Sequence, residues 1–163
     1  YARPSAQRGI KMILLCCILI ITGIFFADLR IKNAVERMDT DDLHRKKKWK
    51  NRILIRKYHN KGAMLNLGQN RSRAVAALSV LLCILITMLF LVSLGRRGNH
   101  LLRIGLSVLL GGAFSNTYDR LKRKYVVDYF SFNVAWEPLR RIIFNISDFC
   151  IMIGAVLAVL GSP

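Results

Sequence analysis

The residue patterns that bind catalytic zinc or activate a serine are missing from this chain. No His-Glu-x-x-His string is present, and the three histidines, His59 among them, are scattered through expected loops. No Gly-x-Ser-x-Gly turn is present either, which excludes the usual serine hydrolase arrangement. The cysteines lack metal-ligand spacing and all lie in apolar runs, where thiols pack as small hydrophobic groups: Cys16, Cys17, Cys83 and Cys150. The sequence therefore predicts no metal site and no other cofactor.

Acidic residues are scarce. The 163 residues include nine aspartates and glutamates against 26 lysines and arginines, which gives a formal net charge of +17. Such a charge can indicate nucleic-acid binding, but the basic residues lie in polar segments between apolar runs, without an aromatic and basic recognition module. We therefore predict no nucleic-acid partner. Anionic lipid headgroups fit better, since each nearby Lys or Arg is attracted to them by about 1 kcal/mol.

Long apolar runs are what the chain does have. Ala74–Leu94 has 21 residues without a charge, enough to cross about 30 Å of hydrocarbon at about 1.5 Å per residue. Met12–Ala27, extended by Ile10, is a second run. Its basic start would also fit a cleaved signal peptide, but no small-x-small cleavage site follows it, so we interpret it as a membrane span.

Two further runs, Leu101–Phe114 and Phe144–Leu160, carry polar residues, which is typical of helices that face partner helices or water. The prediction is thus an all-α membrane protein with a small β-sheet and loop region. Residues 1–163 form a single membrane domain with four transmembrane helices. The spans are expected at about 10–27, 74–94, 101–116 and 143–161, and the long polar segments at about 28–73 and 117–142.

The first long polar segment is expected to contain a short helix at Ile31–Met38. A small sheet on the membrane surface is expected within Arg52–Gly68, because Ile53 and Ile55 alternate with basic residues. The basic run Arg45–Lys50 is either a solvated loop or a strip that binds lipid headgroups. With four spans, both long segments share one side of the membrane. They contain 20 of the 26 basic residues, and the positive-inside rule alone would place them in the cytoplasm.

Two aspartates lie where a membrane helix disfavours acids. Asp128 ends the β-rich string Tyr125–Asp128, and Asp148 lies inside the apolar run Ile142–Leu160. A carboxylate near hydrocarbon is costly unless it is paired, neutralised or hydrated, so such acids indicate function. Two acids on the same side predict a pair that shares one proton and can activate water. A proton relay in a transporter would use buried acids too, and this alternative stays open.

Polar and small residues near these acids are regularly spaced. Asn116 and Arg120 are four residues apart and share a helix face, and Asn145 and Asp148 are three apart. Two adjacent glycines, Gly111 and Gly112, would let neighbouring helices approach closely.

Three strings occur in order: Gly-Gly-Ala-x-x-Asn-x-x-Asp-Arg-Leu at 111–121, Val-Val-Asp-Tyr-Phe at 126–130 and Phe-Asn-x-x-Asp at 144–148. Two earlier strings are Asp-x-x-x-Lys at 28–32 and Asn-x-Gly-Ala at 60–63. Together they cover nearly the whole chain and resemble the lipoprotein signal peptidase family, also called signal peptidase II. Members are bacterial membrane aspartic proteases with four transmembrane helices.

The resemblance implies that Asp128 and Asp148 are the catalytic dyad. It implies that Asn116 and Arg120 hold the substrate backbone and that Asn145 supports the second aspartate. The accessory and structural matches are Asp28, Lys32, Asn60 and Asp119. Ser115 stands where the family usually has glycine, and Lys124 stands near another such position. Both departures concern packing and the substrate-facing loop rather than the type of reaction.

The substrate that the resemblance implies is a prolipoprotein whose signal peptide is cut before a diacylglyceryl-modified cysteine. Its cleavage site faces outward from the bacterial cytoplasmic membrane, so the long segments are expected outside, against the charge count. Lipids and prolipoproteins are the expected partners, and one chain holds every required group, so a monomer suffices. The alternatives are a proton-coupled transporter subunit and a catalytically inactive relative that binds prolipoproteins.

Overall fold

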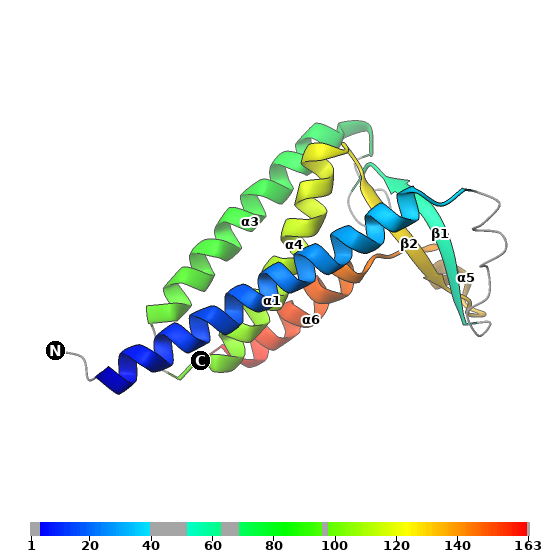
Figure 1. Ribbon diagram of the computed structural model, residues 1–163. Coiled ribbons are helices and arrows are strands. Elements are labelled where there is room, and N and C mark those ends of the chain that lie inside the picture. The colour runs from blue at the N-terminus through cyan, green and yellow to red at the C-terminus, as the bar shows by residue number, and fades with distance from the viewer. Residues whose placement is uncertain (1–3, 40–51, 63–68, 96–97, 163) are drawn as a thin grey trace.

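Among the residues that the structure describes, four helices form an elongated bundle with a two-stranded sheet at one end (Figure 1). The computed structural model describes residues 4–39, 52–62, 69–95 and 98–162. The bundle helices are α1 (Pro4–Glu36), α3 (Ser72–Gly95), α4 (His100–Lys122) and α6 (Ile146–Leu160). The other elements are β1 (Ile53–Asn60), β2 (Val126–Phe132), the 3-10 turn η2 (Gln69–Arg71) and the short helix α5 (Glu137–Arg141). The end of α6 lies far from the sheet, at the opposite end of the bundle.

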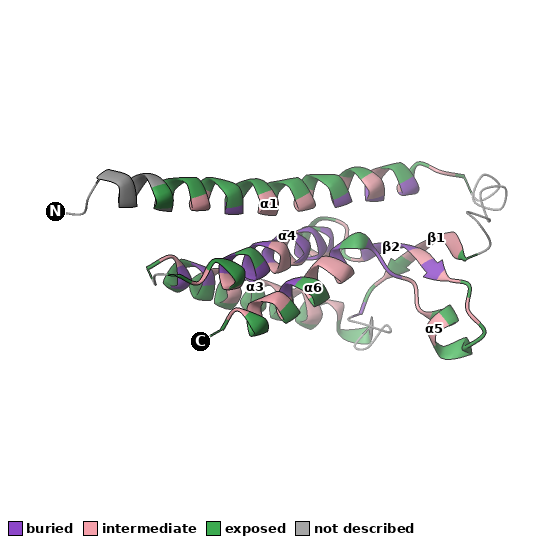
Figure 2. Ribbon diagram, turned by 90° about the horizontal axis from the view of Figure 1, so that it is seen from below, coloured by how far each residue is buried: buried purple, intermediate pink, exposed green. Residues whose placement is uncertain are grey.

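Helix α4 is the centre of the bundle, because it packs against α1, α3 and α6. Its buried Leu106 and Leu110 form an apolar core with Cys17 of α1 and Phe90 of α3. Buried residues are concentrated along α4 and β2, whereas the outer faces of the other helices are largely exposed (Figure 2). The element that carries most of the polar string at 111–121 is therefore the one that the rest of the bundle surrounds.

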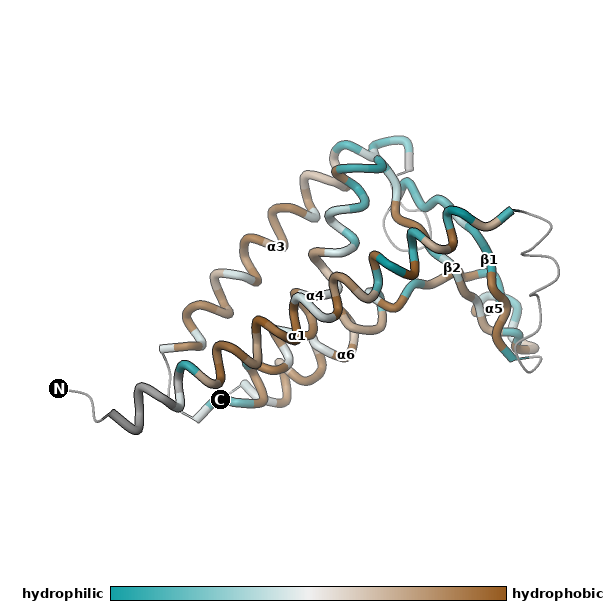
Figure 3. Tube along the Cα trace, in the orientation of Figure 1, coloured by the Kyte–Doolittle hydropathy of each residue, from teal (hydrophilic) through white to brown (hydrophobic). Residues whose placement is uncertain are grey.

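The exterior of the bundle is apolar. Two of the described helices, Lys11–Glu36 within α1 and Ser72–Gly95, are long and apolar enough to cross a membrane, and α6 is an apolar but shorter helix. Leu89, for example, exposes 60% of its surface. Hydrophobic residues dominate along the bundle and hydrophilic ones towards the sheet (Figure 3). Exposed apolar surface on this scale indicates contact with lipid or a partner. The mostly helical fold with a small sheet agrees with the prediction.

Several helix boundaries differ from the expected ones. The separate helix expected at Ile31–Met38 is wrong, because α1 continues unbroken to Glu36. Helix α4 runs past residue 116 to Lys122, so the polar residues that follow the glycines stay helical. Helix α6 begins only at Ile146, after extended backbone at Asn145.

The sheet joins segments that lie far apart in the chain. β1 pairs antiparallel with β2, and Tyr58 lies opposite Asp128. The prediction of a sheet within Arg52–Gly68 is right for the first strand and wrong about its partner among the described residues. The register shifts between Ile55 and Tyr58, where β1 has one extra residue, as in a β-bulge.

Strand alternation gives β2 two different faces. Val127 and Tyr129 pack on Val35 of α1, and Ile31 packs against the same cluster. Because successive side chains of a strand point to opposite sides, Asp128 faces away from this cluster. The apolar neighbours of Asp128 thus anchor the strand while Asp128 itself is left free for other contacts.

Candidate active site

Asp128 and Asp148 line the same pocket, which has a volume of about 210 Å³. Asp128 comes from the middle of β2 and is 2% exposed, and Asp148 comes from the first turn of α6. The pocket has a polar side and an apolar side. The other residues that line it are Asn60, Arg120, Val126, Ile142, Ile143, Phe144, Ile151 and Met152.

Asn145 connects the two aspartates. Its side-chain Nδ2 donates to Asp128 Oδ1 at 2.7 Å, and its backbone N–H donates to Asp148 Oδ2 at 3.1 Å. The backbone N–H of Asp148 in turn donates to Asn145 Oδ1 at 3.0 Å, which completes a capping box at the start of α6. The same two residues therefore begin the helix and fix both carboxylates relative to each other.

Two further asparagines bind the remaining carboxylate oxygens. Asn60 Nδ2 donates to Asp128 Oδ2 at 3.0 Å, and Asn116 Nδ2 donates to Asp148 Oδ1 at 2.9 Å. Each amide is oriented by a donor on its oxygen: Asn60 Oδ1 accepts from the Gly62 N–H, and Asn116 Oδ1 accepts from Lys32 Nζ. Since these donors cannot accept hydrogen bonds, the amide nitrogens must face the aspartates. All four carboxylate oxygens therefore receive an N–H.

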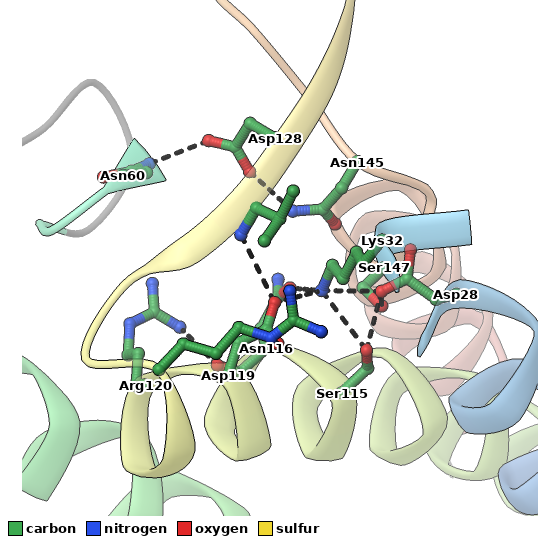
Figure 4. A network of polar contacts seen from close by, with 12 residues as sticks. Asp28, Lys32, Asn60, Ser115, Asn116, Asp119, Arg120, Asp128, Asn145 and Ser147 are labelled. Carbon is green, nitrogen blue, oxygen red and sulfur yellow. Dashed lines mark hydrogen bonds and ion pairs between the residues drawn. The ribbon is translucent and has the colours of Figure 1, made fainter. Parts of the chain in front are cut away.

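A buried ionic network lies behind Asn116 (Figure 4). Lys32 is fully buried, and its Nζ lies 2.7 Å from Asp28 Oδ2 and 3.2 Å from Asp119 Oδ2. One ammonium thus pairs with two buried carboxylates, and it also donates to Ser115 Oγ at 3.2 Å and to Asn116. Removing one member of such a network leaves an unpaired buried charge, which is costly.

Asp28 is also bound by three hydroxyl groups. Ser115 Oγ and Ser147 Oγ each donate to Asp28 Oδ2 at 2.6 Å, and Tyr129 Oη donates to Oδ1 at 2.9 Å. Burial, followed by the charge of Asp28, raises the pKa of Tyr129, so the phenol stays a donor. Its oxygen accepts the Ile146 N–H at 3.0 Å. Ser115, a departure at sequence level, thus adds a hydrogen bond at the junction of α1, α4 and α6.

Asp119 fixes β2 next to the pocket. Its Oδ2 accepts the Val127 N–H at 3.3 Å, and its Oδ1 lies 3.0 Å from Arg123 Nε. Because Val127 directly precedes Asp128, this contact ties the aspartate of the strand to the polar end of α4.

Arg120 extends from α4 to the pocket. Its Nη2 donates to the Gly62 carbonyl at 3.3 Å and its Nη1 to the Asn116 carbonyl at 3.4 Å, both longer than usual. Its Nε has no hydrogen-bond partner among the described residues. Nε is buried, but each terminal nitrogen uses only one of its two N–H groups in the bonds above, so the guanidinium retains donor capacity at the wall of the pocket.

Asp128 titrates far from its ordinary range. Burial raises the pKa of Asp128 to about 7, and the charge of Asp148 raises it as well. The hydrogen bonds from Asn60 and Asn145 favour the ionised form and act in the opposite direction. A carboxyl group with this pKa exchanges its proton near neutral pH.

Close helix packing brings these groups together. A Cβ added to Gly112 would lie 2.5 Å from the Ser147 carbonyl of α6, and one added to Gly111 would lie 2.8 Å from Ile24 Cβ of α1. Each glycine thus permits a close approach to a different helix. This places Asn116, just over one turn along α4, between Lys32 and Asp148.

The structure brings together every residue that the sequence singled out. Asn60, Asn116, Arg120 and Asn145 lie around the aspartates, and Asp28, Lys32 and Asp119 lie behind them. Sequence reasoning missed Ser147 and Tyr129, whose hydroxyls carry no recognisable spacing signal. The expected basic run Arg45–Lys50 lies outside the described residues. Within the described ranges, no cluster of three or more histidine, cysteine or acidic side chains could hold a metal ion.

Comparisons with known proteins show what this chain is similar to. The chain is 34% identical over 98 residues to the lipoprotein signal peptidase of Clostridioides difficile (strain 630), an alignment that covers 60% of this chain and 61% of the relative. It is 33% identical over 99 residues to that of Moorella thermoacetica, covering 61% of each. The chain thus spans about three fifths of the length of these relatives.

Two solved structures of bacterial membrane enzymes, obtained by the in meso method, share the fold. The first has a TM-score of 0.72 at 22% identity, covering 89% of this chain and 85% of the other. The second has a TM-score of 0.68 at 22% identity, covering 89% and 90%. The model of the signal peptidase (SPase) II family matches residues 20–162. Since this match includes most of the helical bundle, the sheet and both aspartates, the chain belongs to the signal peptidase II family.

Proposed function

We propose that this protein is a membrane aspartic endopeptidase that removes signal peptides from diacylglyceryl-modified prolipoproteins and cuts before the lipidated cysteine. The observation that carries the proposal is the junction at Asn145, which binds both Asp128 and Asp148 at the edge of one pocket. Family membership supports the substrate class, because relatives of this chain are lipoprotein signal peptidases.

The two aspartates act as a pair with one shared proton. Two carboxylates about 4 Å apart repel by about 4 kcal/mol at an effective dielectric of about 20, or about 3 pKa units. One of them therefore holds a proton when the other is ionised, in keeping with the pKa of about 7 at Asp128. The pair titrates as a unit, so neither proton role is assigned to one residue.

The ionised member takes a proton from a water molecule, whose oxygen then attacks the scissile carbonyl. The protonated member donates a hydrogen bond to the carbonyl oxygen, and the proton taken from water passes to the leaving amine as the C–N bond breaks. The terminal nitrogens of Arg120 have N–H groups left at the pocket wall and bind a substrate carbonyl there. Asn116 and Asn145 hold the dyad in place.

The pocket suits a substrate that stays in the membrane. Ile143, Ile151 and Met152 give its far side an apolar wall that continues towards the exposed face of α6. Helices α1, α3, α4 and α6 form four spans. The 15 residues of α6 reach about 22 Å, less than the roughly 30 Å of hydrocarbon, so Asp148 at its start lies recessed below one membrane surface.

That surface is the extracytoplasmic face of the bacterial cytoplasmic membrane, where a lipidated precursor presents its cleavage site. The substrate determines this orientation, against the count of basic residues. Lipids surround the bundle, and the enzyme works as a monomer because every group named here belongs to one chain.

The experiment replaces Asp128 or Asp148 with asparagine and follows a lipidated precursor in membranes. Either variant should cut at least about 10³-fold more slowly, because asparagine can neither accept nor return the proton. Glu137→Gln is the control, since Glu137 pairs with Arg140 and Arg141 in α5, outside the pocket. Normal cleavage by a folded Asp128→Asn or Asp148→Asn protein would refute the dyad. Intact precursor with every variant, wild type included, would favour an inactive relative.

A further inference from the structure

Glu36 is an acid at an unfavourable place in its helix. It is the last residue of α1, where the helix dipole disfavours negative charge. Three basic side chains from other elements approach it. His59 Nε2 lies 2.7 Å from Glu36 Oε1, Lys57 Nζ lies 3.6 Å from Oε2, and Arg123 Nη1 lies 3.9 Å from Oε1. Local helix energetics therefore do not explain Glu36, but its tertiary contacts do.

Two of these partners hold β1. Lys57 Nζ also donates to the Glu36 backbone carbonyl at 2.6 Å, which satisfies one of the free carbonyls at the end of α1. The His59 ring stacks on Tyr125, with the ring centres 4.0 Å apart and the planes at 24°. Tyr125 immediately precedes β2. His59 is thus fixed on one side by a carboxylate and on the other by an aromatic ring.

The next residue along β1 serves the pocket. Asn60 donates to Asp128, whereas His59 contacts Glu36. Neighbouring side chains on a strand point to opposite faces, so a contact that fixes His59 also fixes the direction of Asn60. A two-stranded sheet is marginal by itself, and here its register also shifts between Ile55 and Tyr58, next to Lys57. The placement of Asn60 therefore depends on what anchors β1 from outside the sheet.

We propose that Glu36 is a positioning residue of the peptidase, which anchors β1 through His59 and Lys57 so that Asn60 reaches Asp128. Arg123 links this anchor to the other strand, since it lies 3.0 Å from Asp119, which accepts the Val127 N–H. Glu36 therefore holds β1 and Asp119 holds β2 beside the pocket, and Arg123 connects these two acids. This inference rests on the proposed function, because its effect is measured on the reaction of the dyad.

The test is a double-mutant cycle of Glu36→Ala and Asn60→Ala, measured as kcat, KM and the pH profile of precursor cleavage in membranes. Glu36→Ala should lower kcat by about 3- to 10-fold with little change in KM, the size expected for partly exposed ion pairs acting together. The alkaline limb of the profile should move to higher pH, because loss of the Asn60 donor raises the pKa of Asp128. In the Asn60→Ala background, Glu36→Ala should change neither kcat nor the position of the alkaline limb further.

Two matched variants separate positioning from general damage. Glu137→Gln removes another acid that binds two cations and should leave kcat and the pH limb unchanged. Glu36→Gln keeps an oxygen acceptor for His59 but loses the charge, so it should give a smaller loss with a limb shift in the same direction. Glu36→Gln also provides the test of the positioning role if the Glu36→Ala protein does not fold.

Multiplicative losses in the Glu36 and Asn60 double variant, or a drop in kcat without a limb shift, would overturn the positioning role. Neither outcome affects the dyad. A wild-type protein that leaves the precursor intact, or an Asp128→Asn variant that cuts it, would instead overturn the proposed function.

Discussion

Replacing Lys32 with methionine should destabilise this protein strongly. Methionine has a similar length but carries no charge and no donor. The Lys32 ammonium is fully buried and has four oxygen partners at 2.7–3.2 Å, from Asp28, Asp119, Ser115 and Asn116. Without it, the adjacent carboxylates of Asp28 and Asp119 repel each other in a buried setting.

The size of the effect follows from the burial. Removing one partner of a buried ion pair costs about 3–5 kcal/mol, because the remaining charge is left uncompensated. In a chain of this size about 1 kcal/mol shifts the Tm by about 2–4 °C, so the variant should melt about 6–20 °C lower. Thermal unfolding of the purified protein in detergent measures this shift. Lys122→Met, at an exposed lysine in the last turn of α4, is the control and should change stability by less than about 1 kcal/mol.

A second substitution tests the cause. Asp119→Asn removes one of the two carboxylates that Lys32→Met leaves without the ammonium. The double variant Lys32→Met/Asp119→Asn should therefore melt at a higher temperature than Lys32→Met alone. If Lys32→Met unfolds within about 1 kcal/mol of the wild type, the ionic network does not stabilise the fold and the reasoning fails. The reasoning also fails if adding Asp119→Asn lowers the Tm of the Lys32→Met protein further.

Two other predictions concern the pocket and the packing beneath it. Cleavage should fall as pH rises through about 7, because the pair then loses its shared proton, as the pKa of about 7 at Asp128 indicates; a rate that is flat from pH 6 to 9 would contradict this. Gly112→Ala should cost about 1–3 kcal/mol and slow cleavage, because the added methyl meets the Ser147 carbonyl and separates Asn116 from Asp148. Gly23→Ala is its control, because an added Cβ there has nothing within 4 Å; it should leave stability unchanged or raise it, and it should leave the cleavage rate unchanged.

The sequence was most informative where spacing along a single element determines geometry. The four-residue interval from Asn116 to Arg120 places both on one side of α4, where Arg120 donates to the Asn116 carbonyl. The three-residue interval from Asn145 to Asp148 also brings two groups together, but as the two members of a capping box, with Asn145 in extended backbone just before α6. The adjacent glycines also predicted close helix packing, although not that each glycine faces a different helix.

Long-range pairing was harder to predict. β1 was expected to find its partner locally, but its partner β2 lies more than 60 residues away, beyond two bundle helices. Glu36 and His59 have no periodic relation, so their contact across 23 positions could not be seen in the sequence. Ser115 was read only as a departure, because the hydroxyls around Asp28 come from three separate elements.

The choice of neutral amides around the dyad has a physical consequence. Asn60 and Asn145 donate to Asp128 without bringing a full positive charge, which would lower its pKa much further. The nearest buried ammonium, Lys32, lies against two carboxylates that balance it. Its charge still lowers the pKa of Asp128, and its Nζ also donates to the oxygen of Asn116 while the Asn116 nitrogen holds Asp148. Under the proposed function, this frame of neutral donors leaves the pKa of Asp128 at about 7, where two acids can share one proton.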